Sequence, residues 1–336
     1  MIRTEEIGVL HKILDQSENI SRTIGGSIYR KNFKSEQFKR LVGEIYEDLE
    51  DNRLDDPYWP KWDSPWWKIL LLYETDHIDM IDKGLIKRFI NIIDSHYLHF
   101  FPIRESELPE GINPYTDIIC FCALGSIIKI AASKDIPVLE EFSWIKDVIK
   151  SNILDDGGFN CDESVYTTSR KSSLISTLSI LEALFDYERF TDEYKGIVDN
   201  GINYFLKRDL FFTSHGKIMD KKWIKPIFPR FYEVDILRIL TFIVNWSYKR
   251  GKRLDENILF PAVSSIKQSE NENGYIVIKR EWLKQEGTLI NVDGKWIFTE
   301  KASYFELLQK LSSIERPSHF LTREWHSTLK RLINII

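Results

Sequence analysis

The sequence predicts an all-α protein, an (α/α) toroid of roughly five to six helix pairs with one small β-hairpin. Three observations support this prediction. Amphipathic segments alternate with segments that are apolar nearly all round. An Asp-Gly-Gly-Phe turn at residues 156–159 joins one segment of each kind. An aromatic-Pro-basic-aromatic motif precedes two of the apolar segments. Because a helix that is polar on one side needs a surface and an apolar one needs burial, the alternation indicates two concentric layers of helices.

The predicted outer helices carry charged residues on one face. They span residues 35–50, 81–96, 139–150, 192–207 and 255–268. The predicted inner helices are apolar on all sides and span residues 65–73, 115–132, 172–185, 234–246 and 303–311. Each outer helix is followed or preceded by an inner one, which is typical of a repeated helix pair.

The aromatic-Pro motif indicates internal repetition. Residues 59–62 read Trp-Pro-Lys-Trp, and residues 228–231 read Phe-Pro-Arg-Phe. Both lead into an apolar helix that carries one basic residue, Lys68 in the first copy and Arg238 in the second. Proline suits the first turn of a helix because no backbone donor is needed there.

Two regions interrupt the pattern. A turn-rich segment at residues 25–32 separates an N-terminal extension, residues 1–34, from the rest. Residues 274–299 form an insertion in which Asp293-Gly294 lies between alternating apolar residues, a signal for a β-hairpin near residues 287–299. No linker is recognisable, so residues 1–336 are predicted to form one domain.

Composition excludes several classes of protein. The chain has 336 residues, 43% of them hydrophobic and 29% charged, and a net charge of -5. Lys and Arg are scattered, so no basic face for nucleic acid is expected. The longest apolar run, residues 118–128, is too short to span a membrane. Three cysteines and a start without signal-peptide features favour a reducing, cytoplasmic location. Cys120 and Cys122 are expected to lie in the core on different faces of one helix. The sequence predicts no particular protein partner.

Candidate ligand-binding residues lie near the starts of inner helices. In a two-layer ring these starts gather at one end of the cavity, and helix N-termini attract anions. The mixture of aromatic and basic side chains is typical of a ligand pocket with a polar rim. The predicted substrate-binding residues are Trp66, Trp67, Tyr115, Tyr166, Arg170, Arg230, Tyr232 and Arg323.

Three residues are candidates for catalysis: Glu233, Asp235 and His326. Glu233 and Asp235 follow Arg230 and could serve acid–base chemistry if one carboxyl group is desolvated. Positions two apart do not share a helix face, however, and an acid such as Asp235 also suits a first helical turn. His326 lies three positions after Arg323, so both could face one site, or both could be structural.

The Asp156-Gly157-Gly158-Phe159 turn, with the Ser/Thr-containing residues 167–173 and the Leu-rich residues 178–184, resembles the prenyltransferase and squalene-cyclase repeat family. A weaker match lies at residues 271–275. The resemblance implies a toroid whose central cavity binds, and in active members transforms, an apolar or isoprenoid ligand. The Asp-x-Asp-Asp proton donor of the cyclases is missing. Zinc held by Cys161, Asp162 and His319 or His326 would need a spacing that departs from the family, so no cofactor is predicted.

Two other functions remain open from the residues alone. In a carbohydrate-active toroid, a glycoside hydrolase or lyase, Trp and Tyr would stack on sugar rings and carboxylates would flank the bond that breaks. In an inactive toroid that serves as a binding protein or scaffold, bulky side chains would fill the cavity.

Overall fold

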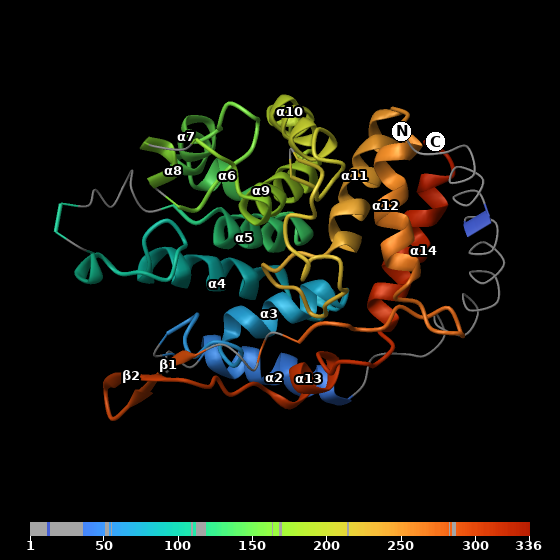
Figure 1. Cartoon of the computed structure of the whole chain (residues 1–336). Helices are drawn as coiled ribbons and strands as arrows, with labels where there is room; N and C mark the ends of the chain where they lie inside the picture. Colours follow the sequence, from blue (N-terminus) through green and yellow to red (C-terminus); the bar gives the residue numbers. More distant parts are fainter. Residues whose placement is uncertain are drawn as a thin grey trace. The chain divides into compact units, whose positions relative to one another are not determined.

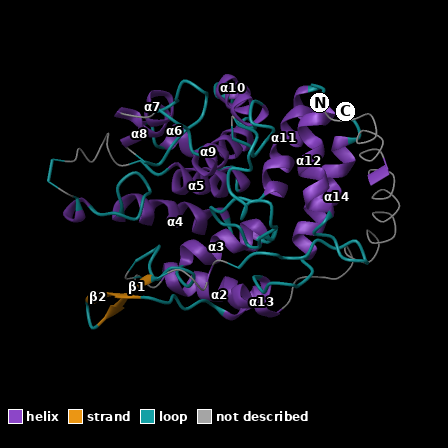
Figure 2. Ribbon diagram, in the orientation of Figure 1, coloured by secondary structure: helices purple, strands orange, loops and turns teal. Residues whose placement is uncertain are grey.

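The computed structural model of the chain describes residues 12–13, 36–50, 54, 56–108, 110–111, 119–162, 164–167, 170–213, 215–281, 283 and 287–336. In this part the elements joined by loops and turns are helices, together with one two-stranded antiparallel sheet (Figures 1 and 2). The predicted all-α class with a small hairpin is therefore confirmed. The expected N-terminal extension, apart from residues 12–13, and Tyr115 lie outside the described residues. None of the described helices is both long and apolar enough to cross a bilayer.

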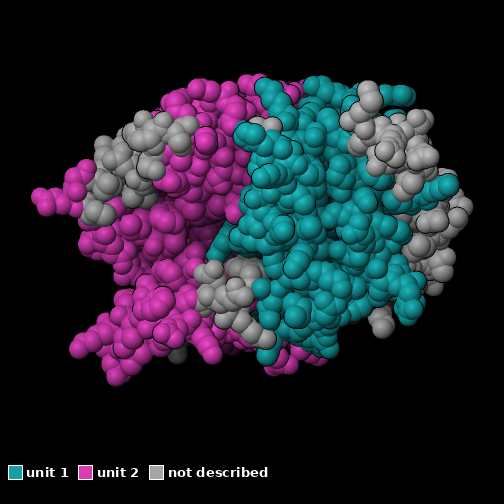
Figure 3. Space-filling view, in the orientation of Figure 1, with its two compact units in different colours: residues 1–35, 205–282, 307–336 teal, residues 36–204, 283–306 magenta. Residues whose placement is uncertain are grey.

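The chain divides into two compact units (Figure 3). Unit 2 comprises residues 36–204 and 283–306. The described part of unit 1 lies within residues 205–282 and 307–336, with residues 12–13. The interpretation of residues 1–336 as one domain is not tested by this division and stays a prediction.

Unit 2 contains most of the helices. They are α2 (Glu36–Glu50), α3 (Pro65–Glu74), α4 (Lys83–His96), α5 (Phe121–Ser133), α6 (Val138–Glu141), α7 (Trp144–Ser151), α8 (Ser164–Thr167), α9 (Leu174–Tyr187) and α10 (Lys195–Leu206), which ends at the boundary with unit 1. Short 3-10 turns at Ile78–Met80 and Glu105–Glu107 lie between them.

Buried and amphipathic helices alternate in unit 2, as predicted. Nearly every residue of α3, α5 and α9 is buried, whereas α2 buries only one stripe, Phe38, Leu41, Ile45 and Leu49. The buried cations of inner helices are paired: the Lys68 ammonium lies 3.1 Å from Asp48, and the Lys129 ammonium lies 2.9 Å from Glu182. A charge taken out of water needs such a partner.

One predicted helix is wrong as a single element. Residues 139–150 form two short helices, α6 and α7, separated at Phe142 and Ser143. Phe142 has an extended φ of -120° and packs edge-on against Phe100 with ring centroids 5.2 Å apart. Tertiary packing of an aromatic side chain therefore overrides the helical periodicity.

The Asp-Gly-Gly-Phe turn is fixed on the start of α9. Gly157 has a φ of +83°, which favours glycine, and a Cβ at Gly158 would lie 2.4 Å from the Ser172 hydroxyl. The Phe159 amide donates to the Thr177 hydroxyl at 2.9 Å, and its carbonyl accepts from the Ser173 amide at 2.8 Å. The predicted hinge between an outer and an inner helix is thus held by hydrogen bonds.

Unit 1 is built on α11 (Ile236–Arg250), with α12 (Glu256–Lys267) and α14 (His319–Leu332) packed against it. The short helix α13 (Glu306–Leu311) begins at the unit boundary. Helix α11 is buried over most of its length and ends at Gly251, which has a left-handed φ of 61°. A hydrogen bond of 2.8 Å between the hydroxyls of Thr241 and Thr328 joins α11 to α14.

The hairpin predicted near residues 287–299 is present in unit 2. Strands β1 (Thr288–Val292) and β2 (Lys295–Thr299) pair antiparallel, and Thr288 lies opposite Thr299. Asp293 and Gly294 have φ values of 51° and 79°, the two positive values that a two-residue type I′ turn requires.

The aromatic-Pro repeat has the same backbone form in both units. The Trp59–Pro60 and Phe228–Pro229 peptide bonds are cis. The aromatic residue two positions after each proline has a positive φ, 67° at Trp62 and 52° at Phe231, and both side chains are buried. The internal repetition inferred from sequence is thus matched by local conformation.

We predict that Gly125→Ala lowers the free energy of unfolding by about 1–3 kcal/mol. A Cβ at Gly125 would lie 2.6 Å from the Ser179 carbonyl oxygen, so α5 and α9 would have to separate. Gly43→Ala in α2 is the matched control, because its Cβ would meet nothing within 4 Å and should stabilise the helix by roughly 0.5–1 kcal/mol. Denaturant unfolding of both variants measures the difference. Equal effects at the two positions would contradict the close packing of α5 on α9.

Candidate functional site

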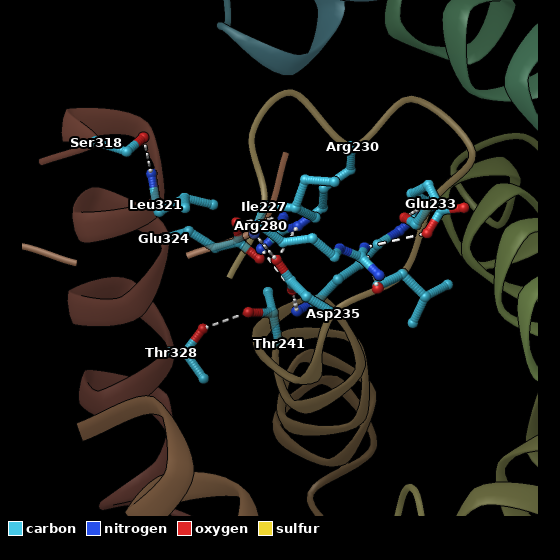
Figure 4. Close-up of polar contacts among 12 residues, drawn as sticks. Ile227, Arg230, Glu233, Asp235, Thr241, Arg280, Ser318, Leu321, Glu324 and Thr328 are labelled. Atoms are coloured by element: carbon cyan, nitrogen blue, oxygen red, sulfur yellow. Dashed lines mark hydrogen bonds and ion pairs between the residues drawn. The ribbon is translucent and has the colours of Figure 1, made fainter. Parts of the chain in front are cut away.

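Asp235, a predicted catalytic residue, is a fully buried carboxylate at the start of α11 in unit 1 (Figure 4). One oxygen accepts from the Arg238 amide at 2.9 Å, so Asp235 caps the helix. The other accepts from the Ile227 amide at 3.0 Å and from the Arg230 Nε at 3.1 Å. The carboxylate therefore joins the aromatic-Pro loop to the first turn of α11.

Arg230, a predicted substrate-binding residue, links two carboxylates. Besides Asp235, its Nη1 donates to Glu324 of α14 at 2.6 Å (Figure 4). Burial acts to lower the pKa of Arg230, but the charges of Asp235 and Glu324 outweigh this effect and raise the pKa, so the guanidinium stays ionised.

Glu233 faces a different partner from Asp235. Its carboxylate lies 3.1 Å from Nη2 of Arg280, which also donates to the Val234 carbonyl at 2.9 Å. In the described part of the chain, Nε and Nη1 of Arg280 are buried without a hydrogen-bond partner. Figure 4 shows Glu233 apart from Asp235, in keeping with the expectation that the two do not form a tight pair. Their assignment to acid–base chemistry stays a prediction.

His326 and Arg323 both lie on α14. The His326 ring is buried, and this burial lowers its pKa although Glu270 acts in the opposite direction. The guanidinium carbon of Arg323 lies 5.9 Å from the centroid of the Phe320 ring. Tyr232 is half-buried beside Glu233 in the loop before α11.

Four other predicted binding residues, Trp66, Trp67, Tyr166 and Arg170, belong to unit 2. Trp66 and Trp67 are buried in α3, where the Trp67 indole donates to the Tyr58 carbonyl at 3.0 Å. The Tyr166 hydroxyl donates to the Asn160 carbonyl at 2.9 Å, and burial raises its pKa to about 12. Arg170 pairs with Asp155 at 3.1 Å on the surface. The two tryptophans therefore pack the core of unit 2.

Sequence reasoning missed a polar cluster in unit 2 that is centred on Asp56. The Asp56 carboxylate is fully buried and accepts the amides of Tyr58 and Trp59 at 2.9 and 2.8 Å, together with the Tyr97 hydroxyl. Burial and the negative charge of Asp56 raise the pKa of Tyr97, so this phenol stays a neutral donor.

His96 and Arg104 meet on the other oxygen of Asp56. Nε2 of His96 lies 3.1 Å from Asp56 Oδ2, and Nη2 of Arg104 lies 2.8 Å from the same atom. The two nitrogens are 2.9 Å apart. The exposed fractions of the His96 and Arg104 side chains are 28% and 31%, so both reach solvent although Asp56 does not.

A strained turn lies next to this cluster in the sequence. His96 ends α4, and His99 and Phe100 follow with left-handed φ values of 48° and 60°. Such values are costly for residues other than glycine and persist where the surrounding structure enforces them, often at functional sites. Packing supplies that constraint here, because the His99 ring stacks on Trp144 at 4.4 Å and Phe100 is fully buried.

Aromatic and basic side chains surround the Asp56 cluster. The guanidinium carbon of Arg104 lies 5.8 Å from the Trp296 ring of strand β2. The Lys61 amide donates to the Thr288 hydroxyl of β1 at 2.7 Å, and its ammonium lies 5.8 Å from the Trp59 ring. The hairpin is therefore attached to the loop that Asp56 holds. Trp59, Lys61 and Trp296 are all partly exposed.

The cysteines correct one prediction. Cys120 precedes α5 as its N-cap residue and is not part of the helix, so Cys120 and Cys122 do not point to different helix faces. Instead, Sγ of Cys122 lies 3.8 Å from Sγ of Cys161, and the thiol of Cys120 interacts with both. Among the described residues, no group of three or more His, Cys, Asp or Glu side chains is arranged to hold a metal ion.

Comparisons with known proteins bear on the predicted resemblance. No family model and no curated protein matches the chain. A search of solved structures finds a chain described as a polysaccharide lyase, 12% identical, with a TM-score of 0.42, covering 97% of this chain and 98% of that chain. The predicted resemblance to the prenyltransferase and squalene-cyclase family is contradicted by this finding. The isoprenoid ligand and the terpenoid type of activity are corrected with it.

We predict that Asp235→Ala lowers the free energy of unfolding by about 3–5 kcal/mol. The substitution removes one of the two carboxylates that compensate the buried charge of Arg230. Asp255→Ala is the matched control. Asp255 caps α12 through a 2.9 Å bond from the Asn257 amide but is exposed, so its loss should cost about 1 kcal/mol. Denaturant unfolding compares the two, and similar losses would contradict the anchoring role of Asp235.

The lowered pKa of His326 predicts acid sensitivity. In the unfolded chain the imidazole takes up a proton near pH 6.5, whereas the folded protein binds it only at lower pH. The unfolded state thus binds more protons below about pH 6.5, and the stability that neutral His326 provides above that pH is lost as the pH falls. His326→Gln should show a smaller decrease in unfolding free energy between pH 7.5 and 5.5 than the wild type. An unchanged pH dependence would contradict this prediction.

Proposed function

We propose that the chain is a carbohydrate-active protein of the lyase type, which binds a uronate-containing polysaccharide and cleaves it by β-elimination. The observation that carries this proposal is the contact of His96 and Arg104 on the buried Asp56 carboxylate, with both side chains open to solvent. A guanidinium pairs with a carboxylate through parallel hydrogen bonds, and an imidazole exchanges protons near neutral pH. Elimination next to a carboxylate needs one group that neutralises the carboxylate charge and one that accepts the neighbouring proton, and these two side chains can supply both roles.

In the proposed reaction, Arg104 pairs with the sugar carboxylate and stabilises the negative charge that develops as the neighbouring C–H bond breaks. His96 accepts that proton. The electron pair of the C–H bond forms a double bond to the next ring carbon, and the glycosidic oxygen on that carbon leaves. The imidazolium then returns the proton to the leaving oxygen. One C–O bond is broken without water, and one product ends in an unsaturated uronate.

Asp56 serves as a positioning residue in this scheme. In the tautomer in which Nε2–H of His96 donates to Asp56 Oδ2, Nδ1 keeps a lone pair that can accept a proton, and Arg104, which has only donors, donates to Asp56 and not to the ring. The same Asp56 oxygen holds Arg104, which sets the spacing between the two functional groups. Tyr97 and two backbone amides hold the other oxygen and fix the orientation of the carboxylate.

The cluster favours elimination over hydrolysis. A glycoside hydrolase places two carboxyl groups on either side of the bond, one as acid and one as base or nucleophile. The Asp56 side chain is 0% exposed and both its oxygens are occupied by donors, so it does not reach a sugar. The groups of the cluster that reach solvent are an imidazole and a guanidinium.

The partly exposed aromatic residues beside the cluster suit a sugar chain. Trp59 and Trp296 offer flat apolar faces on which a pyranose ring can stack, and the Lys61 ammonium adds a positive charge for a further uronate. These side chains come from the aromatic-Pro loop and the hairpin, which the Lys61–Thr288 hydrogen bond holds together.

We predict that the full-length protein releases unsaturated products from at least one uronate-containing polysaccharide and none from a neutral glucan. The ultraviolet absorbance of the new double bond measures the reaction. His96→Gln should lower kcat by about 10²–10⁴-fold because the proton acceptor is lost. Arg104→Lys should raise KM and lower kcat, because an ammonium does not pair with a carboxylate through two parallel bonds.

Arg189→Lys is the control for Arg104→Lys. Arg189 is a half-exposed arginine of unit 2 that pairs with Asp135 at 3.4 Å, and its exchange should leave the activity unchanged. A folded wild type that releases no unsaturated product from any of the uronate polymers, or that loses nothing on His96→Gln, would rule out the proposed reaction.

A further inference from the structure

A second chemically distinctive cluster lies in unit 2, where three thiols meet at the starts of two neighbouring helices. Cys120 is the N-cap residue of α5 and Cys122 lies in its first turn. Cys161 follows the Asp-Gly-Gly-Phe turn and lies against the first turn of α9, since its amide donates to the Ser176 hydroxyl at 3.2 Å. Helices α5 and α9 pack directly on each other.

The contacts distinguish Cys161 from the other two cysteines. Its Sγ accepts from the Ser176 hydroxyl at 3.1 Å and lies 3.8 Å from Sγ of Cys122. The thiols of Cys120 and Cys122, followed by the Ser176 hydroxyl, hold the pKa of the Cys161 thiol well below its usual value, although burial opposes them. Contacts with Cys120 and Cys161, and burial, raise the pKa of Cys122 well above its usual value.

The difference in environment between Cys161 and Cys122 is typical of a pair of cysteines that can be oxidised. The thiolate is the nucleophile in reactions of cysteine, and helix N-termini and hydrogen-bond donors favour it. A redox-sensitive cysteine combines thiolate character and access to solvent with a nearby second thiol. Each of the three cysteine residues has some exposed surface, although the thiols themselves are largely buried, so access is limited to a small oxidant such as hydrogen peroxide.

We propose that Cys161 is a hydroperoxide-sensitive thiolate and that Cys122 is its partner in a reversible disulfide. In the first step the Cys161 thiolate attacks one oxygen of the hydroperoxide and the O–O bond breaks. The products are Cys161 sulfenic acid and an alkoxide or hydroxide ion, which takes a proton from water. In the second step the Cys122 sulfur attacks the sulfenic sulfur, and a disulfide and one water molecule form. The two sulfurs lose two electrons, and the hydroperoxide gains them.

The geometry selects Cys122 as the partner. A disulfide requires sulfurs about 2.05 Å apart, and the Cys122 and Cys161 sulfurs start at 3.8 Å, within reach of side-chain rotation and a small shift of the loop. Cys161 lies in a loop, so it can move without breaking a helix. The disulfide would tie the first turn of α5 to the loop that precedes α9.

The full-length protein should be treated with one equivalent of hydrogen peroxide in metal-free buffer and digested without reduction. We expect one cross-linked peptide pair that joins residues 122 and 161, with Cys120 still free and the pair reversed by an added thiol. Cys161 should react roughly tenfold or more faster than Cys120. In Cys122→Ser, the Cys161 sulfenic acid should accumulate and be trapped by a 1,3-diketone probe.

Three further variants test the assignment. Cys120→Ser should retain the cross-link, whereas Cys161→Ser should abolish it. Ser176→Ala removes only one hydrogen-bond donor to Cys161, so the oxidation should remain but slow several-fold at neutral pH and recover at higher pH. Thiols that react only after denaturation, a cross-link through Cys120, or zinc held by all three thiols in the native protein would each overturn the proposal. Each of these three results can be observed with the wild-type protein, without any variant.

Discussion

The structure depends on two fully buried carboxylates, Asp56 in unit 2 and Asp235 in unit 1. Burial of a carboxylate costs several kcal/mol unless charged and hydrogen-bonding partners compensate it. Each carboxylate obtains the same kinds of partner: backbone amides of the aromatic-Pro loop and an arginine side chain. This requirement fixes the loop and the helices beside it. It also gives the internal repeat seen in the sequence a physical reason.

The two carboxylates differ in what they present to solvent. Asp235 caps α11, and its partner Arg230 is itself buried and paired again with Glu324, so that cluster is closed. Asp56 holds Arg104 and His96, whose outer parts remain exposed. A buried carboxylate thus caps a helix in one unit and holds two partly exposed side chains together in the other. Left-handed backbone accompanies both arrangements, at Phe231 beside the Asp235 cluster and at His99 and Phe100 beside the Asp56 cluster.

The Asp-Gly-Gly-Phe turn explains why a local motif was a poor guide to family and ligand. Gly157 is required by its positive φ, and Gly158 by the approach of Ser172 and Thr177. Any chain that must turn sharply between an outer helix and a tightly packed inner helix meets these constraints. The motif therefore indicates a hinge between helix layers. Backbone conformation and close packing alone account for both of its glycines.

The sequence by itself determined most of the helices, their alternation in unit 2 and the hairpin at residues 288–299, because these features follow from periodicity and from residues close together in the chain. It did not predict α14, and the predicted inner helix at residues 303–311 is only the short α13, in which Leu307 and Leu308 are buried. Only the tertiary structure decided that Asp56 meets His96, Tyr97 and Arg104, and that Cys161 lies against Cys122. The buried face of a helix can be predicted from the spacing of its apolar residues. The partner of a buried charge depends on packing between segments about 40 residues apart or more, and no local sequence pattern predicts it. The break at Phe142 has the same origin, since contact with Phe100 outweighs the helical preference of its neighbours.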